Sequence, residues 1–148
     1  MKKVFIEVEK WNKSLITDAL ENGVDAFFSS NNEIIEKIKQ LAKVDVYNKN
    51  SLPENIKFFE ITNKEQEIEA SKINSNIYLI ISTGDWKIIP FENLIAQREN
   101  LFAVVNNEKD AIEVIGILEK GVTGVYISNC SDDEKINILK KIKSKKGK

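Results

Sequence analysis

Short apolar runs alternate with amphipathic helical patterns along almost the whole chain, and this alternation limits the fold more than any other feature. Strand-like runs occur at 4–8, 24–28, 44–47, 56–61, 77–82, 101–105 and 122–127. Helical spacing of apolar residues predicts helices at 12–22, 33–42, 63–73, 90–99, 108–120 and from 131 to about 143. Residues 48–55, which include Pro53, are the one stretch that predicts irregular loop. Strands that alternate with helices in this way are expected to run parallel.

The ends of several predicted helices carry cap signals. Gly23 is a natural stop for the first helix because glycine accepts the left-handed backbone that ends many helices. Asn63 with Gln66, and Ser131 with Glu134, have the spacing of capping boxes. These signals support the helix boundaries that the apolar spacing predicts.

Two folds are compatible with a buried parallel sheet, a barrel and an open sheet. A full eightfold barrel needs at least about 200 residues, so a chain of 148 residues predicts a trimmed or incomplete TIM-barrel-like α/β fold. The alternative, an open doubly wound three-layer sheet, usually has a glycine-rich first βα turn. Glu9-Lys10-Trp11-Asn12 occupies that place instead. We favour the barrel-like fold, partly on a resemblance given below, as a single domain over 1–148 with a basic tail at about 140–148.

Composition excludes several kinds of chemistry. The chain has no histidine, so a Ser-His-Asp or Cys-His mechanism cannot be assembled within it. With Cys130 as the single cysteine, neither an internal disulfide nor a structural zinc site is expected, and a reducing, cytoplasmic location is predicted. A net charge of −1 gives no support for nucleic-acid binding, and no apolar stretch is long enough to predict a membrane span. Carboxylates, lysines, tyrosines and bound cofactors remain as catalytic groups.

The loop after the apolar run at 77–82 is the leading candidate site. It reads Gly84-Asp85-Trp86-Lys87 and runs into a helix that Pro90 would open. Loops that follow the strands of a parallel sheet carry the chemistry of such folds. Asp85 and Lys87 form the one compact acid–base pair that we identify among the polar residues at the predicted strand ends, and they are the predicted catalytic residues. The alternative is a loop whose aromatic residues cover the rim of the core.

Other polar residues are expected at the same edge of the sheet. The predicted substrate-binding residues are Trp86, Glu92, Asn93, Ser29 and Asn106, and no metal site is predicted. Further polar residues at the predicted strand ends are Glu7, Glu9, Ser30, Asn63, Lys64, Asn107, Ser128 and Asn129.

Three stretches of the chain resemble one known family. Residues 84–96 (G-D-W-K-I-I-P-F-E-N-L-I-A) closely resemble the D-W-T-I-I-P-L-E-N-L-I-A segment of the archaeal-type (type II) 3-dehydroquinate synthases. Trp11 followed by Ala19-Leu20-Glu21 is similar to the start of that family, and residues 109–125 are similar to its K-D-A…I-L-E-K-G-V-D-G-V segment. The resemblance spans nearly the whole chain in order.

The resemblance implies a reaction in aromatic amino-acid biosynthesis, the shikimate pathway. It implies NAD-dependent oxidative deamination of an amino-dideoxy-heptulosonate, followed by cyclisation to 3-dehydroquinate. The cofactor so implied is NAD and the partner is a small-molecule substrate. Family members are much longer than this chain, and their later G-S-G-D-R-V-C and V-N-A-G-P-V-H-A-Y segments have no counterpart here. Residues 48–55 are also shorter than in the family, as if part of a βα unit were missing, and Lys87 stands where threonine is common.

Three hypotheses follow. In the first, the chain is the N-terminal half of a dehydroquinate synthase-like enzyme, active alone or with a separate C-terminal-domain chain. Asp85 would then transfer a proton or contact the substrate amine, Lys87 would contact an anion or carbonyl, and Trp86 would stack on the substrate. In the second, it is a non-catalytic ligand-binding or regulatory barrel module. In the third, it is a purely structural subunit in which a partner covers Trp86 and Phe91. Whichever hypothesis holds, the exposed sheet edges of an incomplete barrel would favour association, as a homo-oligomer or with a separate C-terminal-domain chain.

Overall fold

The strands form one parallel sheet that curls into an incomplete barrel. The computed structural model describes residues 2–83, 93–118 and 121–144. Seven strands are paired in the order β3-β2-β1-β7-β6-β5-β4. Their bounds are β1 (Lys3–Glu7), β2 (Ala26–Ser29), β3 (Asp45–Asn48), β4 (Ile56–Ile61), β5 (Tyr78–Thr83), β6 (Leu101–Val105) and β7 (Gly124–Ile127). Because β1 pairs with both β2 and β7, the first and last strands are neighbours, as in a closed barrel.

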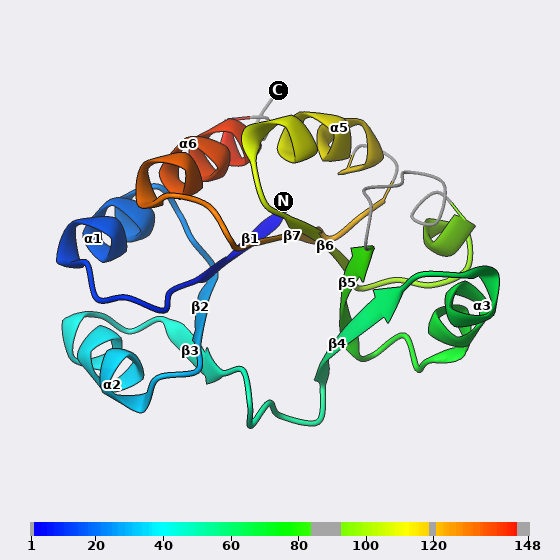
Figure 1. Cartoon of the computed structure of the whole chain (residues 1–148), viewed down its shortest axis with the longest axis horizontal. Coiled ribbons are helices and arrows are strands. Elements are labelled where there is room, and N and C mark those ends of the chain that lie inside the picture. The colour runs from blue at the N-terminus through cyan, green and yellow to red at the C-terminus, as the bar shows by residue number, and fades with distance from the viewer. Residues whose placement is uncertain (1, 84–92, 119–120, 145–148) are drawn as a thin grey trace.

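The barrel is open between β3 and β4, which are the two edge strands of the sheet. Residues 49–55 connect these strands without a helix, at the bottom of the view in Figure 1. Leu52 from this connection packs against the apolar cluster inside the barrel. A full barrel of this kind has eight βα units, so the predicted incomplete barrel is confirmed. The predicted irregular loop is confirmed at 49–55, whereas Asn48 is the last residue of β3.

All labelled helices lie on the outer face of the curved sheet (Figure 1). They are α1 (Lys13–Glu21), α2 (Asn32–Leu41), α3 (Lys64–Lys72), α5 (Glu108–Leu118) and α6 (Asp132–Lys143). A doubly wound sheet would carry helices on both faces, so the three-layer alternative is wrong. In the described part of the chain, no helix combines the length and the apolar character that crossing a membrane requires.

Alternate residues of each strand build two separate cores. On β1, Val4 and Ile6 face outward and join the cluster that packs under the helices, while Phe5 faces inward. The inner cluster is largely aromatic, and the rings of Phe5 and Phe102 stack with centroids 4.2 Å apart. Side chains fill the interior of a barrel this size, so the inner cluster leaves the ends of the strands as the place for a site.

The helix expected at 90–99 differs from the structure. Residues 90–92 lie outside the described residues, the chain is helical at 93–95, and it turns from 96 onward. The amides of Gln97 and Arg98 both donate to the carbonyl of Leu94 at 2.9 Å, which closes a tight turn. The predicted extension to residue 99 is therefore wrong, because the chain has to turn back here to enter β6.

The two predicted capping boxes are each half formed. The side chain of Asn63 accepts the amide of Gln66 at 3.0 Å, and Ser131 Oγ accepts the amide of Glu134 at 3.1 Å, as predicted. The predicted return bonds, from each cap residue's own amide to the Gln66 or Glu134 side chain, are wrong. Gln66 accepts the amide of Thr62, and Glu134 accepts the amide of Glu108 at the start of α5. Glu134 thus caps a neighbouring helix, which local spacing does not reveal.

Candidate functional site

The carboxyl ends of the parallel strands meet at one edge of the barrel, which we call the mouth. Ligands of parallel βα folds bind at this edge. Polar side chains of several elements converge there, and the densest group joins β1, β2, β7 and the residue after β3. We call Glu7, Glu9, Lys49 and Tyr126 the mouth network.

Glu7 is the last residue of β1, at the inward position two residues after Phe5. Its Oε2 accepts a hydrogen bond from the hydroxyl of Tyr126 at 2.8 Å and pairs with Lys49 Nζ at 2.7 Å. Tyr126 is 2% exposed and belongs to the inner aromatic cluster. Burial, together with the charge and hydrogen bond of Glu7, raises the pKa of Tyr126 well above its usual value. Tyr126 therefore remains a protonated donor at neutral pH.

Glu9 lies beyond the end of β1 and is held by the turn that follows β2. Its carboxylate accepts hydrogen bonds from the amide of Ser30 at 3.1 Å, the hydroxyl of Ser30 at 2.8 Å and the hydroxyl of Ser29 at 3.2 Å. It also pairs with Lys49 at 3.1 Å. Burial alone would raise the pKa of Glu9, but the Ser30 hydrogen bonds and the Lys49 cation outweigh burial, so the pKa is lowered.

Lys49 reaches the mouth from the first residue after β3, at the start of the connection across the open side of the barrel. Its amide donates to the carbonyl of Ser29 at 2.9 Å, which fixes its backbone beside β2. Burial would lower the pKa of its ammonium, but the hydrogen bonds and charges of Glu7 and Glu9 outweigh burial and raise the pKa. Lys49 is consequently a cation at neutral pH.

A second lysine, on the outer helix α6, contacts the backbone of the mouth network. Lys135 of α6 is 8% exposed, and its Nζ donates to the carbonyl oxygen of Glu7 at 2.8 Å. Asp132 lies 3.7 Å from Lys135 and accepts a hydrogen bond from Asn12 at 2.8 Å. The last helix therefore holds the end of the first strand in place.

A smaller polar pair lies between β6 and β7. Asn106 follows β6, and its side-chain amide donates to the carbonyl oxygen of Ser128 at 2.9 Å and to the Ser128 hydroxyl at 3.0 Å. The backbone amide of Asn106 donates to the carboxylate of Asp110 at 3.3 Å. Both donor hydrogens of the Asn106 side chain are thus directed to Ser128, and this pair joins two strand ends at the mouth.

The predicted site residues have different positions in the structure. Ser29 lies at the mouth, is fully buried and supports Glu9, while Asn106 lies at the mouth beside Ser128. Asn93 instead donates to Glu67 of α3 at 3.1 Å, which ties its segment to a helix. Asp85, Trp86, Lys87 and Glu92 lie outside the described residues, so their roles stay predictions.

Neither Lys49 nor Tyr126 was predicted from the sequence as a site residue. Glu7 and Glu9 were expected at the rim, but Asp85 and Lys87 were taken as its one compact acid–base pair. The ion pairs of Lys49 with Glu7 and Glu9 form an acid–base group that this prediction left out. Lys49 falls in a segment that predicted only loop, and Tyr126 in a run that predicted only buried strand. The available signal for Tyr126 was its hydroxyl, which lies at an inward position one residue before the end of β7.

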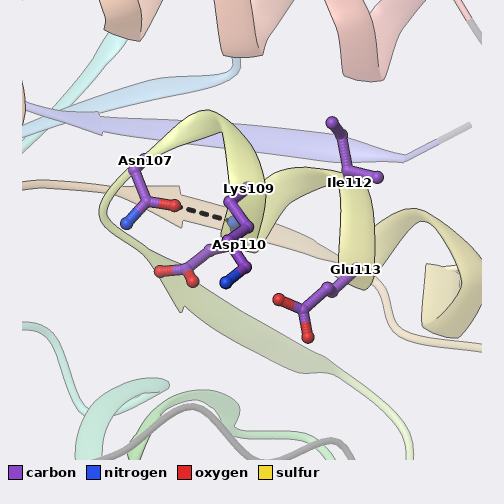
Figure 2. A pocket seen from close by; sticks show the side chains of 5 residues that line it. All are labelled: Asn107, Lys109, Asp110, Ile112 and Glu113. Carbon is purple, nitrogen blue, oxygen red and sulfur yellow. Dashed lines mark hydrogen bonds between the residues drawn. The ribbon is translucent and has the colours of Figure 1, made fainter.

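A surface hollow of about 760 Å³ lies along the beginning of α5, beside Asn106 and outside the mouth network. Figure 2 shows the side chains that line it, Asn107, Lys109, Asp110, Ile112 and Glu113. Asn107 accepts the amide of Asp110 at 2.8 Å, an ordinary helix cap. None of these five residues is buried, so the hollow has no desolvated polar group with which to fix a ligand.

The chain matches one family model over residues 1–143, that of the 3-dehydroquinate synthase II N-terminal domain. The chain belongs to this family.

Curated relatives of this dehydroquinate synthase II domain extend well beyond it. A 3-dehydroquinate synthase homolog of Aquifex aeolicus is 36% identical over 145 residues, which is 96% of this chain and 43% of the relative. A 3-dehydroquinate synthase of Methanosphaerula palustris is 38% identical over 133 residues, 86% of this chain and 39% of the relative. The 3-dehydroquinate synthase of Methanoculleus marisnigri is 33% identical over 145 residues, which is 96% of this chain and 43% of the relative. The chain thus spans about two fifths of the length of these relatives.

A solved structure supports the fold of the dehydroquinate synthase II domain. Monomers of phosphoribosylanthranilate isomerase from Thermotoga maritima superpose with a TM-score of 0.73 at 13% identity, over 98% of this chain and 99% of that chain. At this identity the likeness concerns the fold alone.

The described residues do not fit the pyrophosphate of NAD, the cofactor that the family resemblance implies. Such groups bind at glycine-rich turns that open a helix, and the turns at 8–12, 30–31, 62–63, 106–107 and 128–131 contain no glycine. Helices α2, α3, α5 and α6 carry acidic residues in their first turns. At α1, the Asn12 side chain already accepts the amides of Ser14 and Leu15.

Proposed function

We propose that this chain is the N-terminal barrel of a 3-dehydroquinate synthase-like enzyme of aromatic amino-acid biosynthesis. The proposed reaction is the NAD-linked oxidative deamination and cyclisation of an amino-dideoxy-heptulosonate. The observation that carries the proposal is the family match over residues 1–143. The mouth network supports it, since it provides carboxylate acceptors and a cationic donor where ligands of this fold bind.

The barrel is proposed to work with a C-terminal half that holds the nucleotide. The relatives carry more than half of their length outside the matched region, and the described residues here offer no pyrophosphate site. The chain on its own is then expected to be inactive. Substrate would lie over Glu7 and Lys49, and Asp85 and Lys87, in the sequence that follows β5, stay further proposed contacts.

The test measures absorbance of reduced nicotinamide with the amino-dideoxy-heptulosonate and NAD present. The chain is assayed alone and with the separately expressed C-terminal region of the Aquifex aeolicus homolog. We expect NAD reduction only in the mixture, and a loss of at least about tenfold for Glu7→Gln, because a charged hydrogen-bond acceptor is removed. Absence of reduction in the mixture, with both parts folded and associated, contradicts the proposal.

A non-catalytic ligand-binding module is the second candidate. It is favoured by the mouth network, whose carboxylates and ammonium are positioned by residues of this chain alone. This candidate predicts saturable binding of a sugar acid to the chain without NAD reduction, whether or not the C-terminal region is added. Turnover in the mixture would reject it.

A further inference from the structure

Lys49 has a hydrogen-bond donor to spare at the mouth. Its ammonium carries three N–H groups, and its ion pairs are with Glu7 Oε2 at 2.7 Å and Glu9 Oε2 at 3.1 Å. Among the described residues, no third acceptor contacts it. The side chain is 29% exposed, so the remaining N–H is accessible to a ligand.

Glu7 has an acceptor to spare beside it. Tyr126 and Lys49 both bind Oε2, whereas Oε1 accepts no hydrogen bond from any described residue. The side chain of Glu7 is 15% exposed. One donor and one acceptor therefore lie next to each other, on two side chains joined by a 2.7 Å ion pair.

The two side chains are held more firmly than an ordinary surface ion pair requires. Exposed ion pairs contribute little because both partners lose rotamer freedom. Here Glu7 is fixed by the buried Tyr126, and Glu9 by the hydroxyls of Ser29 and Ser30 and the Ser30 amide. Lys49 is thus clamped between two carboxylates that are themselves positioned, which is how binding groups are preorganised.

The protonation state of Lys49 limits its role. Because Glu7 and Glu9 raise the pKa of the Lys49 ammonium, it is not the neutral amine that imine formation needs. A charged ammonium donor binds oxygen instead, whether that oxygen belongs to a hydroxyl, a carbonyl or a carboxylate.

We propose that Lys49 and Glu7 form a binding subsite for two oxygens on adjacent carbons of a polyhydroxylated ligand. One hydroxyl donates to Glu7 Oε1, and the neighbouring hydroxyl or carbonyl oxygen accepts the free N–H of Lys49. The inference rests on the proposed function for the identity of the natural ligand, a sugar-like acid, but the subsite is defined by these two side chains.

The test is isothermal titration calorimetry of the full chain with quinate, which carries adjacent hydroxyls, and with cyclohexanecarboxylate, which has none. We expect saturable binding of quinate only. Lys49→Met should weaken it at least about tenfold, since a charged hydrogen bond is lost. The matched control is Lys10→Met, an exposed lysine of the β1–α1 connection at the same mouth, which should change affinity less than about twofold.

A direct measurement covers the case in which Lys49→Met does not fold. In the wild-type chain, the Lys49 ammonium resonance is expected to shift as quinate is added, and the Lys10 resonance is not. No binding of quinate, equal binding of the two probes, or equal loss in the two variants overturns the inference. Quinate binding without NAD reduction in the reconstituted mixture rejects only the proposed enzyme activity, whereas turnover that Lys49→Met leaves intact rejects only this subsite.

Discussion

The hydroxyl of Tyr126 lies 2.8 Å from Oε2 of Glu7, and this hydrogen bond joins the aromatic interior of the barrel to its polar mouth. The two residues are 119 positions apart in the sequence. They come from the first and last strands, which are neighbours in the sheet.

Replacing Tyr126 with phenylalanine is expected to lower the free energy of unfolding by about 1.5–3 kcal/mol, the usual contribution of a hydrogen bond to a charged group. Urea denaturation measures the change. Tyr78→Phe is the control, because Tyr78 belongs to the same inner cluster and its hydroxyl has no hydrogen-bond partner among the described residues. Equal losses in both variants would show that removing a hydroxyl from this cluster, and not breaking the bond to Glu7, is responsible.

The same pair predicts a loss of stability in alkali. Burial and Glu7 raise the pKa of Tyr126 above its ordinary value of 10.0. Above that pH, the unfolded chain releases a proton that the folded chain retains, so the free energy of unfolding falls as pH rises. Below pH 10 this contribution is complete. The difference between wild type and Tyr126→Phe, followed by urea denaturation, should therefore be constant at neutral pH and shrink above about pH 10. A difference that stays constant into alkali would contradict this.

Arg98 is expected to be among the most sensitive positions for stability. It is 5% exposed, and its guanidinium donates to the carbonyl oxygens of Ile77 at 2.7 Å, Ile73 at 2.9 Å, Asn74 at 3.2 Å and Ala70 at 3.3 Å. Arg98→Met leaves these carbonyls without that donor and should cost about 3–5 kcal/mol in thermal or urea unfolding. Lys72→Met, at an exposed position at the end of α3, should change stability by less than about 0.5 kcal/mol.

Two glycines should respond to alanine in opposite directions. At Gly124 in β7, an added Cβ would overlap the carbonyl oxygen of Lys3 and lie 2.9 Å from the ring of Phe102. Gly124→Ala should therefore cost about 3 kcal/mol by forcing β1 and β7 apart. At Gly116, on the exposed side of α5, an added Cβ meets nothing within 4 Å. Gly116→Ala should raise the free energy of unfolding by about 0.5–1 kcal/mol, through helix propensity. Chemical denaturation of both variants separates the two effects, and a gain at Gly124 would contradict the packing described here.

The site was less predictable than the fold. The apolar spacing placed Glu7, Glu9, Ser29 and Asn106 near strand ends, and the structure has them there. It did not reveal that Lys49 pairs with both glutamates, because a lysine in an irregular loop has no periodic pattern to locate it. Nor did it reveal the partner of Asn93, which depends on how α3 packs beside its segment.

The sequence by itself determined the parallel βα order, the one-sided apolar faces of the helices and the gap at 48–55, because each depends on the spacing of nearby residues. Gly23 shows this at one position, since its φ of +88° gives the left-handed helix end that its place in the sequence predicted. Only the tertiary structure decided which polar groups meet at the mouth. Lys49 and Glu9 are 40 positions apart, and Tyr126 and Glu7 are 119 positions apart. Such contacts depend on strand order and register, which are set by the packing of the whole barrel and not by any local pattern.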